Sequence, residues 1–374
     1  MRLLPLYIFS LIIPLVTYSY AVSKDYLYAT YLFMLYFMTI PIYTRKCAYT
    51  HNLRIYSAFV ILVFLSCINF FDAPRLEYPI YQTIAYSLIP YLTIIFVYTQ
   101  CKTITIAGDY VKLYSIVFFI LGVYRFFRSE EVISIIGSNQ IANNAFYYSL
   151  MCLPLVLLTK NHFIRIVAIL VTALICIMSV KRTALIAIVL ISTIYMLQSV
   201  KFKSKFRMIM SLSAVILFTY YILNSSVFER LDATNNRLEQ VQEDGGSGRD
   251  MLYLRFLTTD YNDIIGFPEL LLGKGFRAYH RKYRDVEAVH NDYLELFYSF
   301  GILGLCFMVW ILVKTIKELR MYRKSPDYGL AYWSFTILLI IYSFTGGVFT
   351  FIYSMLPLYI FMGYMESVNN YNNH

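Results

Sequence analysis

Long apolar runs follow one another along this sequence and are interrupted by one long polar segment. A membrane-spanning helix needs about 20 predominantly apolar residues, and about twelve such runs fit into the 374 residues. Charged residues make up 14% of the chain and the mean hydropathy is +0.59, whereas soluble domains carry about 25% charged residues. The sequence therefore predicts a polytopic membrane protein. The expected runs lie near residues 3–22, 26–43, 55–71, 80–100, 111–127, 143–159, 164–180, 183–200, 208–224, 294–313, 329–345 and 348–366.

An all-α fold is expected for these runs, because a helix satisfies its own backbone hydrogen bonds inside a bilayer. The first run is expected to remain as a helix, since Tyr18-Ser19-Tyr20-Ala21 is a poor signal-peptide cleavage site. Three regions follow from this reading. Residues 1–224 hold about nine transmembrane helices, residues 225–292 form one large polar loop, and residues 293–374 hold about three further helices.

The short loops between the runs predict the orientation of the chain. Every second loop is basic, and basic loops face the cytoplasm. Both termini are therefore expected in the cytoplasm, and the loop 225–292 on the periplasmic or extracellular face. The basic residues of these loops are Arg45, Lys46, Arg54, Lys102, Lys160, Arg165, Lys201, Lys203, Lys205, Arg207, Lys314, Lys317, Arg320, Arg323 and Lys324.

The distribution of charge argues against nucleic acid as a partner. The formal net charge is +10, but the loop from Ser225 to Asp292 holds nine Lys and Arg against twelve Asp and Glu. The basic excess lies in the short loops, where it reports topology. The six cysteines lie in or beside apolar runs, so no Cys-type metal site is expected. The sequence also lacks a Walker A loop, a His-Glu-x-x-His motif and a dinucleotide fingerprint, and we expect no cofactor.

Arginines on the outward side are the first candidates for chemistry. Arg182 follows Lys181 in a very short connection between two apolar runs. Cationic residues near lipid depth are costly and usually face a cavity, and the planar guanidinium matches phosphate oxygens. A lipid-linked pyrophosphate is the ligand that suits such a set. The other outward arginines are Arg125, Arg128, Arg249, Arg277, Arg281 and Arg284.

Each of these arginines also has a structural explanation. Lys181 and Arg182 can extend toward the interface from a helix end. Arg125 and Arg128 can anchor their helix or pair with acidic neighbours. Arg249 follows Gly-Ser-Gly and can be an ordinary solvated loop residue, and the basic cluster at 277–284 can solvate a helix face.

His290 lies where the polar loop meets the next apolar run. Its unperturbed pKa of about 6.5 allows general-base catalysis at neutral pH; the alternative is a histidine packed at the membrane surface. Asn291 and Asp292 are in position to cap a helix that begins near Tyr293. Gly301 and Gly304 predict close helix packing.

These residues resemble signature motifs of the O-antigen ligase/polymerase superfamily. His290-Asn291-Asp292-Tyr293-Leu294, followed by Phe300-Gly301-Ile302-Leu303-Gly304-Leu305, is similar to the motif that closes the large periplasmic loop of that family. Gly248-Arg249 and Gly273-Lys274-Gly275-Phe276 occur upstream in the family order. Ser179-Val180-Lys181-Arg182-Thr183 looks like the short family turn between two membrane helices. The motifs cover roughly residues 175 to 310.

The resemblance implies a metal-independent, inverting glycosyltransferase of the membrane-embedded GT-C type in the inner (plasma) membrane. The donor would be an oligosaccharide on undecaprenyl pyrophosphate. Arg182 and Arg249 would bind the pyrophosphate, and His290 would position or deprotonate the acceptor hydroxyl. Further substrate contacts would come from Arg277, Arg281, Arg284, Lys181, Tyr293 and Asn291.

Two family reactions, and one function of another class, stay open at this point. A polymerase transfers the growing glycan onto a lipid-linked repeat unit, whereas a ligase transfers it onto the lipid A core; the resemblance favours the polymerase. A polysaccharide flippase or exporter is the third alternative. A chain-length regulator and a flippase are the protein partners that the family implies.

Overall fold

The computed structural model describes residues 93–98, 100–101, 107–136, 145–179, 182–199, 249–275, 278–282, 291–325, 328–345 and 352–372. These residues form helices joined by short turns, with no strand among them, as the apolar runs predicted. The predicted runs near 3–22, 26–43, 55–71 and 208–224 lie outside the described residues. The twelve-span layout and the GT-C class therefore remain predictions.

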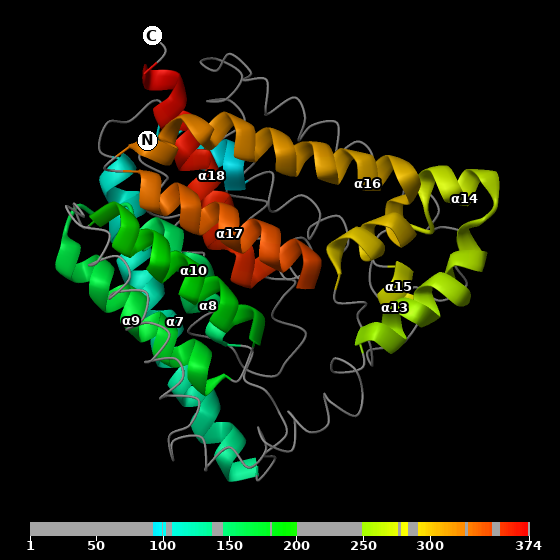
Figure 1. The fold of residues 1–374 in the computed structure, drawn as a ribbon, viewed down its shortest axis with the longest axis horizontal. Helices are drawn as coiled ribbons and strands as arrows, with labels where there is room; N and C mark the ends of the chain where they lie inside the picture. Colours follow the sequence, from blue (N-terminus) through cyan, green and yellow to red (C-terminus); the bar gives the residue numbers. More distant parts are fainter. Residues whose placement is uncertain are drawn as a thin grey trace.

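Seven helices make up the larger part of the described residues (Figure 1). Four of them, α9, α10, α16 and α17, begin within two residues of the predicted runs. The seven helices are α7 (Ala107–Ile136), α8 (Phe146–Val156), α9 (His162–Met178), α10 (Arg182–Ser199), α16 (Asp292–Leu319), α17 (Gly329–Thr345) and α18 (Ile352–Asn372).

Helix α8 forms the centre of this bundle. It packs against α7, α9, α17 and α18. From Leu150 to Leu158 every residue is buried, because the helix is apolar on all sides and can be covered on all sides. The neighbouring helices instead bury one face each. Ala168, Ile169 and Ile175 of α9 face the core, for example, whereas Phe163 and Leu170 of the same helix are exposed.

The exposed apolar side chains fit a bilayer environment. Two described helices are long and apolar enough to cross a membrane, Gly108–Ser129 and Asp292–Lys324, and four further apolar helices are shorter. A soluble surface rarely carries extended apolar patches of this kind. The apolar helices indicate a membrane protein.

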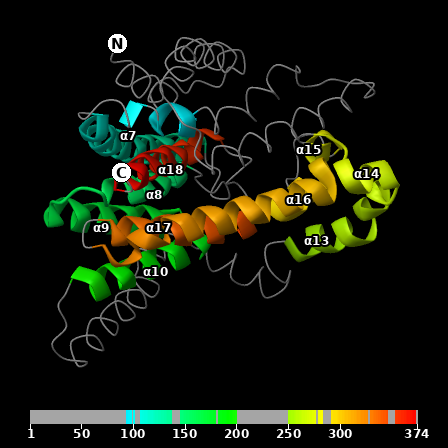
Figure 2. The ribbon, with the colours of Figure 1, turned by 90° about the horizontal axis from the view of Figure 1, so that it is seen from above.

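Helix α16 connects the bundle to a smaller helical unit. It packs with α17 and α18, and its N-terminal end carries the helices of the predicted polar loop (Figures 1 and 2). These helices are α13 (Arg249–Thr258), η2 (Asp260–Ile264), α14 (Phe267–Leu272) and α15 (Ala278–Lys282). We call them, together with residues 292–300 of α16, the outer subdomain. Its small core consists of Phe256, Ile264, Ala278, Tyr279 and Tyr298.

A short 3-10 helix, η3 (Arg320–Lys324), ends α16 at its bundle end. It packs against α17, and it is followed by Ser325, whose backbone is extended. The chain thus reverses direction between α16 and α17 over a few residues. The two ends of α16 therefore carry the outer subdomain and this basic turn, respectively.

Candidate functional site

The N-terminus of α16 is fixed by its cap. The side-chain oxygen of Asn291 accepts hydrogen bonds from the backbone N–H groups of Tyr293 at 2.9 Å and Leu294 at 3.2 Å. Asp292 and Glu295 lie in the first turn, where a carboxylate is favoured by the helix dipole. The predicted helix start is confirmed, and Asn291 is the cap. Asn291 therefore marks a well-defined helix start.

Helix α16 is broken at Gly301. This residue has φ 66° and ψ −162°, which is not a helical conformation. In a regular helix, the carbonyls of Tyr298 and Ser299 would accept from the N–H groups four residues further on. Here they accept from the N–H groups of Lys274 and Gly275, each at 2.9 Å. The segment after α14 thus completes the hydrogen bonding of the first half of α16.

The two backbones come into direct contact at this break. A Cβ atom at Gly301 would overlap the carbonyl of Leu271, and a Cβ atom at Gly273, which has φ 73°, would overlap the carbonyl of Ser299. The close packing predicted for Gly301 is confirmed, with α14 as the partner. At Gly304 a Cβ atom would overlap the Phe300 side chain of the same helix. The break at Gly301 therefore limits the space at Gly304.

An ionic cluster holds α15 against η2. The Lys282 ammonium donates to Asp260 Oδ1 and to Asp263 Oδ2, both at 2.6 Å. Tyr298 of α16 donates its hydroxyl to Asp263 at 2.8 Å. Partial burial disfavours ionisation of Asp263, but the hydrogen bonds from Lys282 and Tyr298 and the nearby lysine charges outweigh it and lower the pKa of this carboxyl. Both carboxylates are therefore held as acceptors for Lys282.

Aromatic rings and one arginine complete this packing. Phe256, Tyr279 and Tyr298 pack with ring centroids 5.5 to 6.0 Å apart. Arg255 donates to the Tyr279 hydroxyl at 3.3 Å, and its Nε lies 3.9 Å from the buried Asp260 carboxylate. Burial raises the pKa of Tyr279 to about 12, so this hydroxyl stays protonated at physiological pH. The cluster connects α13, η2, α15 and α16.

Several predicted site residues can be placed by their backbone. Arg182 is the first residue of α10, Arg249 is the first residue of α13, and Arg281 lies within α15. Since α13, α15 and the start of α16 share one core, the segments that carry Arg249, Arg281 and Asn291 belong to the same small subdomain. Arg182 belongs to the bundle. The remaining predicted site residues, Lys181, Arg277, Arg284 and His290, lie outside the described residues.

Tyr293 faces the bundle from the first turn of α16. Its hydroxyl lies 3.1 Å from the Ser343 hydroxyl, and its ring packs on Phe344 with centroids 4.8 Å apart. These contacts join the start of α16 to the end of α17. A substrate-binding role for Tyr293 remains a prediction.

The two arginines of α7 have partners that the sequence did not suggest. The Arg125 guanidinium lies 4.4 Å from the ring centroid of Tyr148, and Arg128 contacts the Tyr124 hydroxyl at 3.5 Å. The sequence had suggested either interfacial anchors or pairing with acidic neighbours, and the side chains of Glu130 and Glu131 lie outside the described ones. Aromatic partners suit an interfacial position, because a ring face attracts a cation without the cost of burying a carboxylate.

Sequence reasoning missed two features of this region. Lys282 had been read as part of a basic cluster, but its charge is used by two carboxylates of the same subdomain. The Gly273-Lys274-Gly275 segment had been noted only as part of the family motif, but its N–H groups complete the hydrogen bonding of a broken helix. The sequence signal was the presence of two glycines in this segment and of Gly301 in the following long helix. That signal can be interpreted only when the two segments are known to be in contact.

Among the described residues, no group of three or more His, Cys, Asp and Glu side chains is arranged to hold a metal ion. The metal-independent mechanism stays a prediction for the chain as a whole.

Residues 167–309 match the family model described as O-antigen ligase. The matched range begins in α9 and includes α10, the outer subdomain and α16 as far as Val309, with the break at Gly301 inside it. A comparison with curated proteins gave no match. The predicted motif residues from Arg182 to Gly304 all lie within the matched range.

Proposed function

From its domain of the O-antigen ligase/polymerase superfamily at residues 167–309, we propose that this protein is an O-antigen polymerase. It would transfer a glycan from undecaprenyl pyrophosphate onto a lipid-linked repeat unit at the periplasmic face of the inner membrane. The observation that carries this proposal is the common core of α13, α15 and the start of α16. That core supports a joint role for the family's loop arginines and its histidine.

Binding of the donor is assigned to Arg182 and Arg249. Each is the first residue of a helix, where unpaired backbone N–H groups and the helix dipole favour an anion. A guanidinium adds two parallel hydrogen bonds to phosphate oxygens. Arg277, Arg281 or Arg284 would complete the pyrophosphate site, while the apolar surface of the bundle accommodates the polyprenyl chain.

The transfer step needs little covalent help from the protein. The acceptor hydroxyl oxygen attacks the anomeric carbon from the face opposite the pyrophosphate, and the bond from that carbon to the pyrophosphate oxygen breaks. The arginines stabilise the charge that develops on the leaving group. His290 takes the hydroxyl proton, a contribution of about 10²–10⁴ in rate, and the configuration at the anomeric carbon inverts.

The rigid outer subdomain supports this mechanism by fixing positions. Alignment of reacting groups is a large part of catalysis when the leaving group is already good. The Lys282 cluster holds α15, and the backbone bonds from Lys274 and Gly275 hold the first half of α16. Two described elements, α15 before the stretch that contains His290 and the start of α16 after it, are thus anchored.

A ligase reaction is the second candidate, because the matched family model is described as O-antigen ligase. Both reactions use the same donor, so the arginines do not separate them. Gene deletion does: loss of a polymerase leaves core that carries a single repeat unit, whereas loss of a ligase leaves bare core and accumulates lipid-linked polymer.

The decisive test is a reaction with purified full-length protein and a defined undecaprenyl-pyrophosphate-linked repeat unit. We expect products with two or more repeats on one lipid and release of undecaprenyl pyrophosphate. Transfer only when lipid A core is added would favour the ligase. No transfer to either acceptor, with folded protein, would contradict both.

A further inference from the structure

One face of α16 changes from apolar to basic along its length. The exposed side chains at Ile302, Val309, Trp310 and Val313 follow the helical repeat and lie on that face. The same face continues at the bundle end of the helix with exposed basic side chains, at Lys317, Arg320 and Lys324. The candidate membrane span ends at Lys324. The change in polarity therefore falls where the hydrocarbon region should give way to the headgroups.

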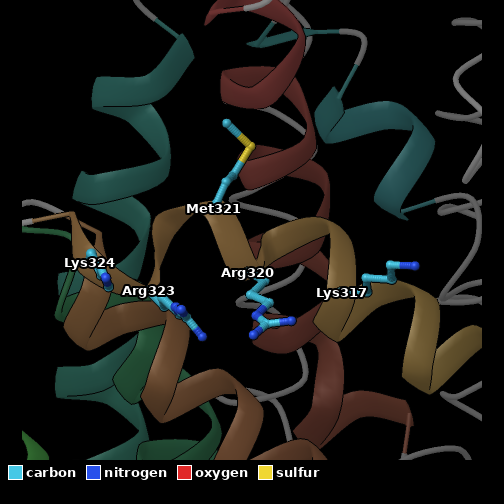
Figure 3. Close-up of a pocket in the computed structure, with 5 residues that line it drawn as sticks. All are labelled: Lys317, Arg320, Met321, Arg323 and Lys324. Atoms are coloured by element: carbon cyan, nitrogen blue, oxygen red, sulfur yellow. The ribbon is translucent and has the colours of Figure 1, made fainter.

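The basic end of this face is hollowed. An open hollow of about 440 Å³ is lined by Lys317, Arg320, Met321, Arg323 and Lys324. Figure 3 shows the guanidinium groups of Arg320 and Arg323 extending to the same side of η3, with Met321 on the other side. Guanidinium groups on the same side of η3 offer several N–H donors to an anion.

No carboxylate neutralises these charges among the described side chains. The ion pairs found elsewhere, such as Lys282 with Asp260, have no counterpart at Lys317, Arg320, Arg323 or Lys324. Four like charges around one hollow repel one another unless an anion lies between them. Among the described side chains, the charge around the hollow is positive and therefore favours an anionic ligand.

We propose that this hollow binds the headgroup of an anionic phospholipid of the surrounding bilayer. The phosphodiester would accept hydrogen bonds from Arg320 and Arg323, with Lys317 and Lys324 on either side. The acyl chains would lie along the apolar face from Val313 to Trp310. Basic pockets at the ends of membrane helices are suited to such headgroups.

The apolar face is the reason for choosing a lipid over free phosphate. A soluble anion would use the basic residues alone and leave Val309, Trp310 and Val313 without a role. A lipid satisfies both halves of the face at once. Trp310 lies ten residues from Arg320, which is about 15 Å along a helix, so a bound acyl chain would pass close to the indole ring.

This distance makes Trp310 a reporter for the lipid. The chain has two tryptophans, so a Trp333→Phe variant leaves Trp310 as the one fluorophore of its kind. The full-length protein in neutral detergent is titrated with phosphatidylglycerol brominated near the middle of its acyl chains, since bromine quenches indole on contact. Phosphatidylcholine with the same brominated chains is the headgroup control.

We expect quenching by phosphatidylglycerol at lower concentration than by phosphatidylcholine. The double variant Arg320→Gln, Arg323→Gln should weaken phosphatidylglycerol binding about thirty-fold. Each charge removed should cost about 1 kcal/mol, which is a factor of about five in affinity. Arg320→Lys with Arg323→Lys keeps the charge but loses the planar fork, and should show an intermediate loss. Lys112→Gln with Arg128→Gln, two charges removed from α7, is the matched control and should leave binding unchanged.

Three outcomes would overturn the proposal. The first is equal quenching by both lipids, which would mean that the face binds acyl chains without regard to charge. The second is a glutamine variant that is folded, as judged by gel filtration, and binds as tightly as the parent. The third is displacement of the lipid by millimolar inorganic phosphate, which would assign the hollow to a free anion.

Discussion

Lys282 illustrates how one side chain can organise a subdomain. Its ammonium reaches two carboxylates on η2, and one of these, Asp263, also accepts from Tyr298 on α16. Asp260 is fully buried, and burying a charged group is costly unless the group is paired and hydrogen-bonded. Lys282 thus allows η2, α15 and α16 to pack around the Asp260 carboxylate, which would be costly to bury without a partner.

We expect Lys282→Met to destabilise the outer subdomain by about 1–3 kcal/mol, the usual cost of a buried acceptor that loses its donor. Limited proteolysis in detergent should show faster cleavage between 249 and 290. Lys274→Met is the matched control: Lys274 pairs with Glu269 at 3.6 Å, both half-exposed, and such pairs contribute less than about 1 kcal/mol. Equal cleavage of the two variants would argue against a special role for Lys282.

Acid should release the same cluster. The pKa of Asp263 is lowered in the folded protein, so its contribution to stability is complete above the pKa of the unfolded chain, about 3.9. That contribution is lost as the pH falls through the lowered value. The difference in unfolding midpoint between the parent and Asp263→Asn should be constant at neutral pH and shrink below about pH 4. A difference that persists unchanged at pH 3 would contradict an ionised Asp263.

His290→Ala tests the proposed base. Transfer in the purified system should fall about 10²- to 10⁴-fold, and the ladder of chain lengths in lipopolysaccharide gels should disappear at unchanged protein level. Arg182→Ala should abolish the ladder as well, through loss of donor binding. Asn161→Ser is the control, because Asn161 caps α9 away from the proposed site and serine can still cap a helix. Unchanged ladders from both alanine variants would count against the site.

At the scale of elements, hydropathy predicted the bundle helices closely and the outer subdomain poorly. The run predicted at 329–345 is α17 (Gly329–Thr345), and the run at 183–200 is α10 (Arg182–Ser199). Membrane helices are readable in this way because one requirement, an apolar length, decides them. The short helices α13, α14 and α15 are too short to be stable alone. They depend on contacts between segments distant in sequence.

The candidate site also combines features that depend on nearby residues, which the sequence predicted, with features that depend on distant segments, which it did not. The Asn291 cap was predictable because it depends on residues two and three positions away. The break at Gly301 was not, since it depends on Leu271 and on the N–H groups of Lys274 and Gly275, about 30 positions earlier. Long-range contacts of this kind also determine which side chains lie together around a substrate.

The broken helix makes a prediction of its own. Gly301→Ala would place a Cβ atom against the Leu271 carbonyl at a φ of 66°, and backbone strain of this kind costs about 1–3 kcal/mol before the overlap is counted. We expect α14 to detach from α16, so that proteolysis of the loop accelerates and transfer activity is lost. Gly108→Ala is the control, because its Cβ atom would meet the Tyr364 ring at 3.3 Å in a regular helix. Normal activity of Gly301→Ala would show that the break is dispensable.

At the scale of the whole molecule, α16 connects the outer subdomain to the basic hollow. The outer subdomain covers its N-terminal end and the basic hollow lies at its C-terminal end (Figures 1 and 3). After the break at Gly301, residues 302–319 of α16 and the five residues of η3 extend for about 27 Å at 1.5 Å per residue and about 10 Å at 2.0 Å per residue, which together exceed the roughly 30 Å of a hydrocarbon core. A helix of this length can present its two ends on opposite faces of the membrane.

Labelling of single cysteines tests that arrangement. In a cysteine-free background, Thr259→Cys places a thiol at an exposed position of the outer subdomain whose side chain makes no capping bond. Lys324→Cys places one at the exposed rim of the hollow. A membrane-impermeant maleimide added to cells with a permeabilised outer membrane should label position 259 and spare position 324. After lysis of the inner membrane both should be labelled.

The two positions are informative together because each controls for the other. Transfer to a lipid-linked acceptor in the periplasm requires the outer subdomain on that side, and the positive-inside rule requires the basic end on the other. Labelling of both positions in intact inner membranes would place the ends of α16 on one side and contradict the spanning role of this helix. Labelling of position 324 alone would invert the topology, and with it the face on which the proposed transfer takes place.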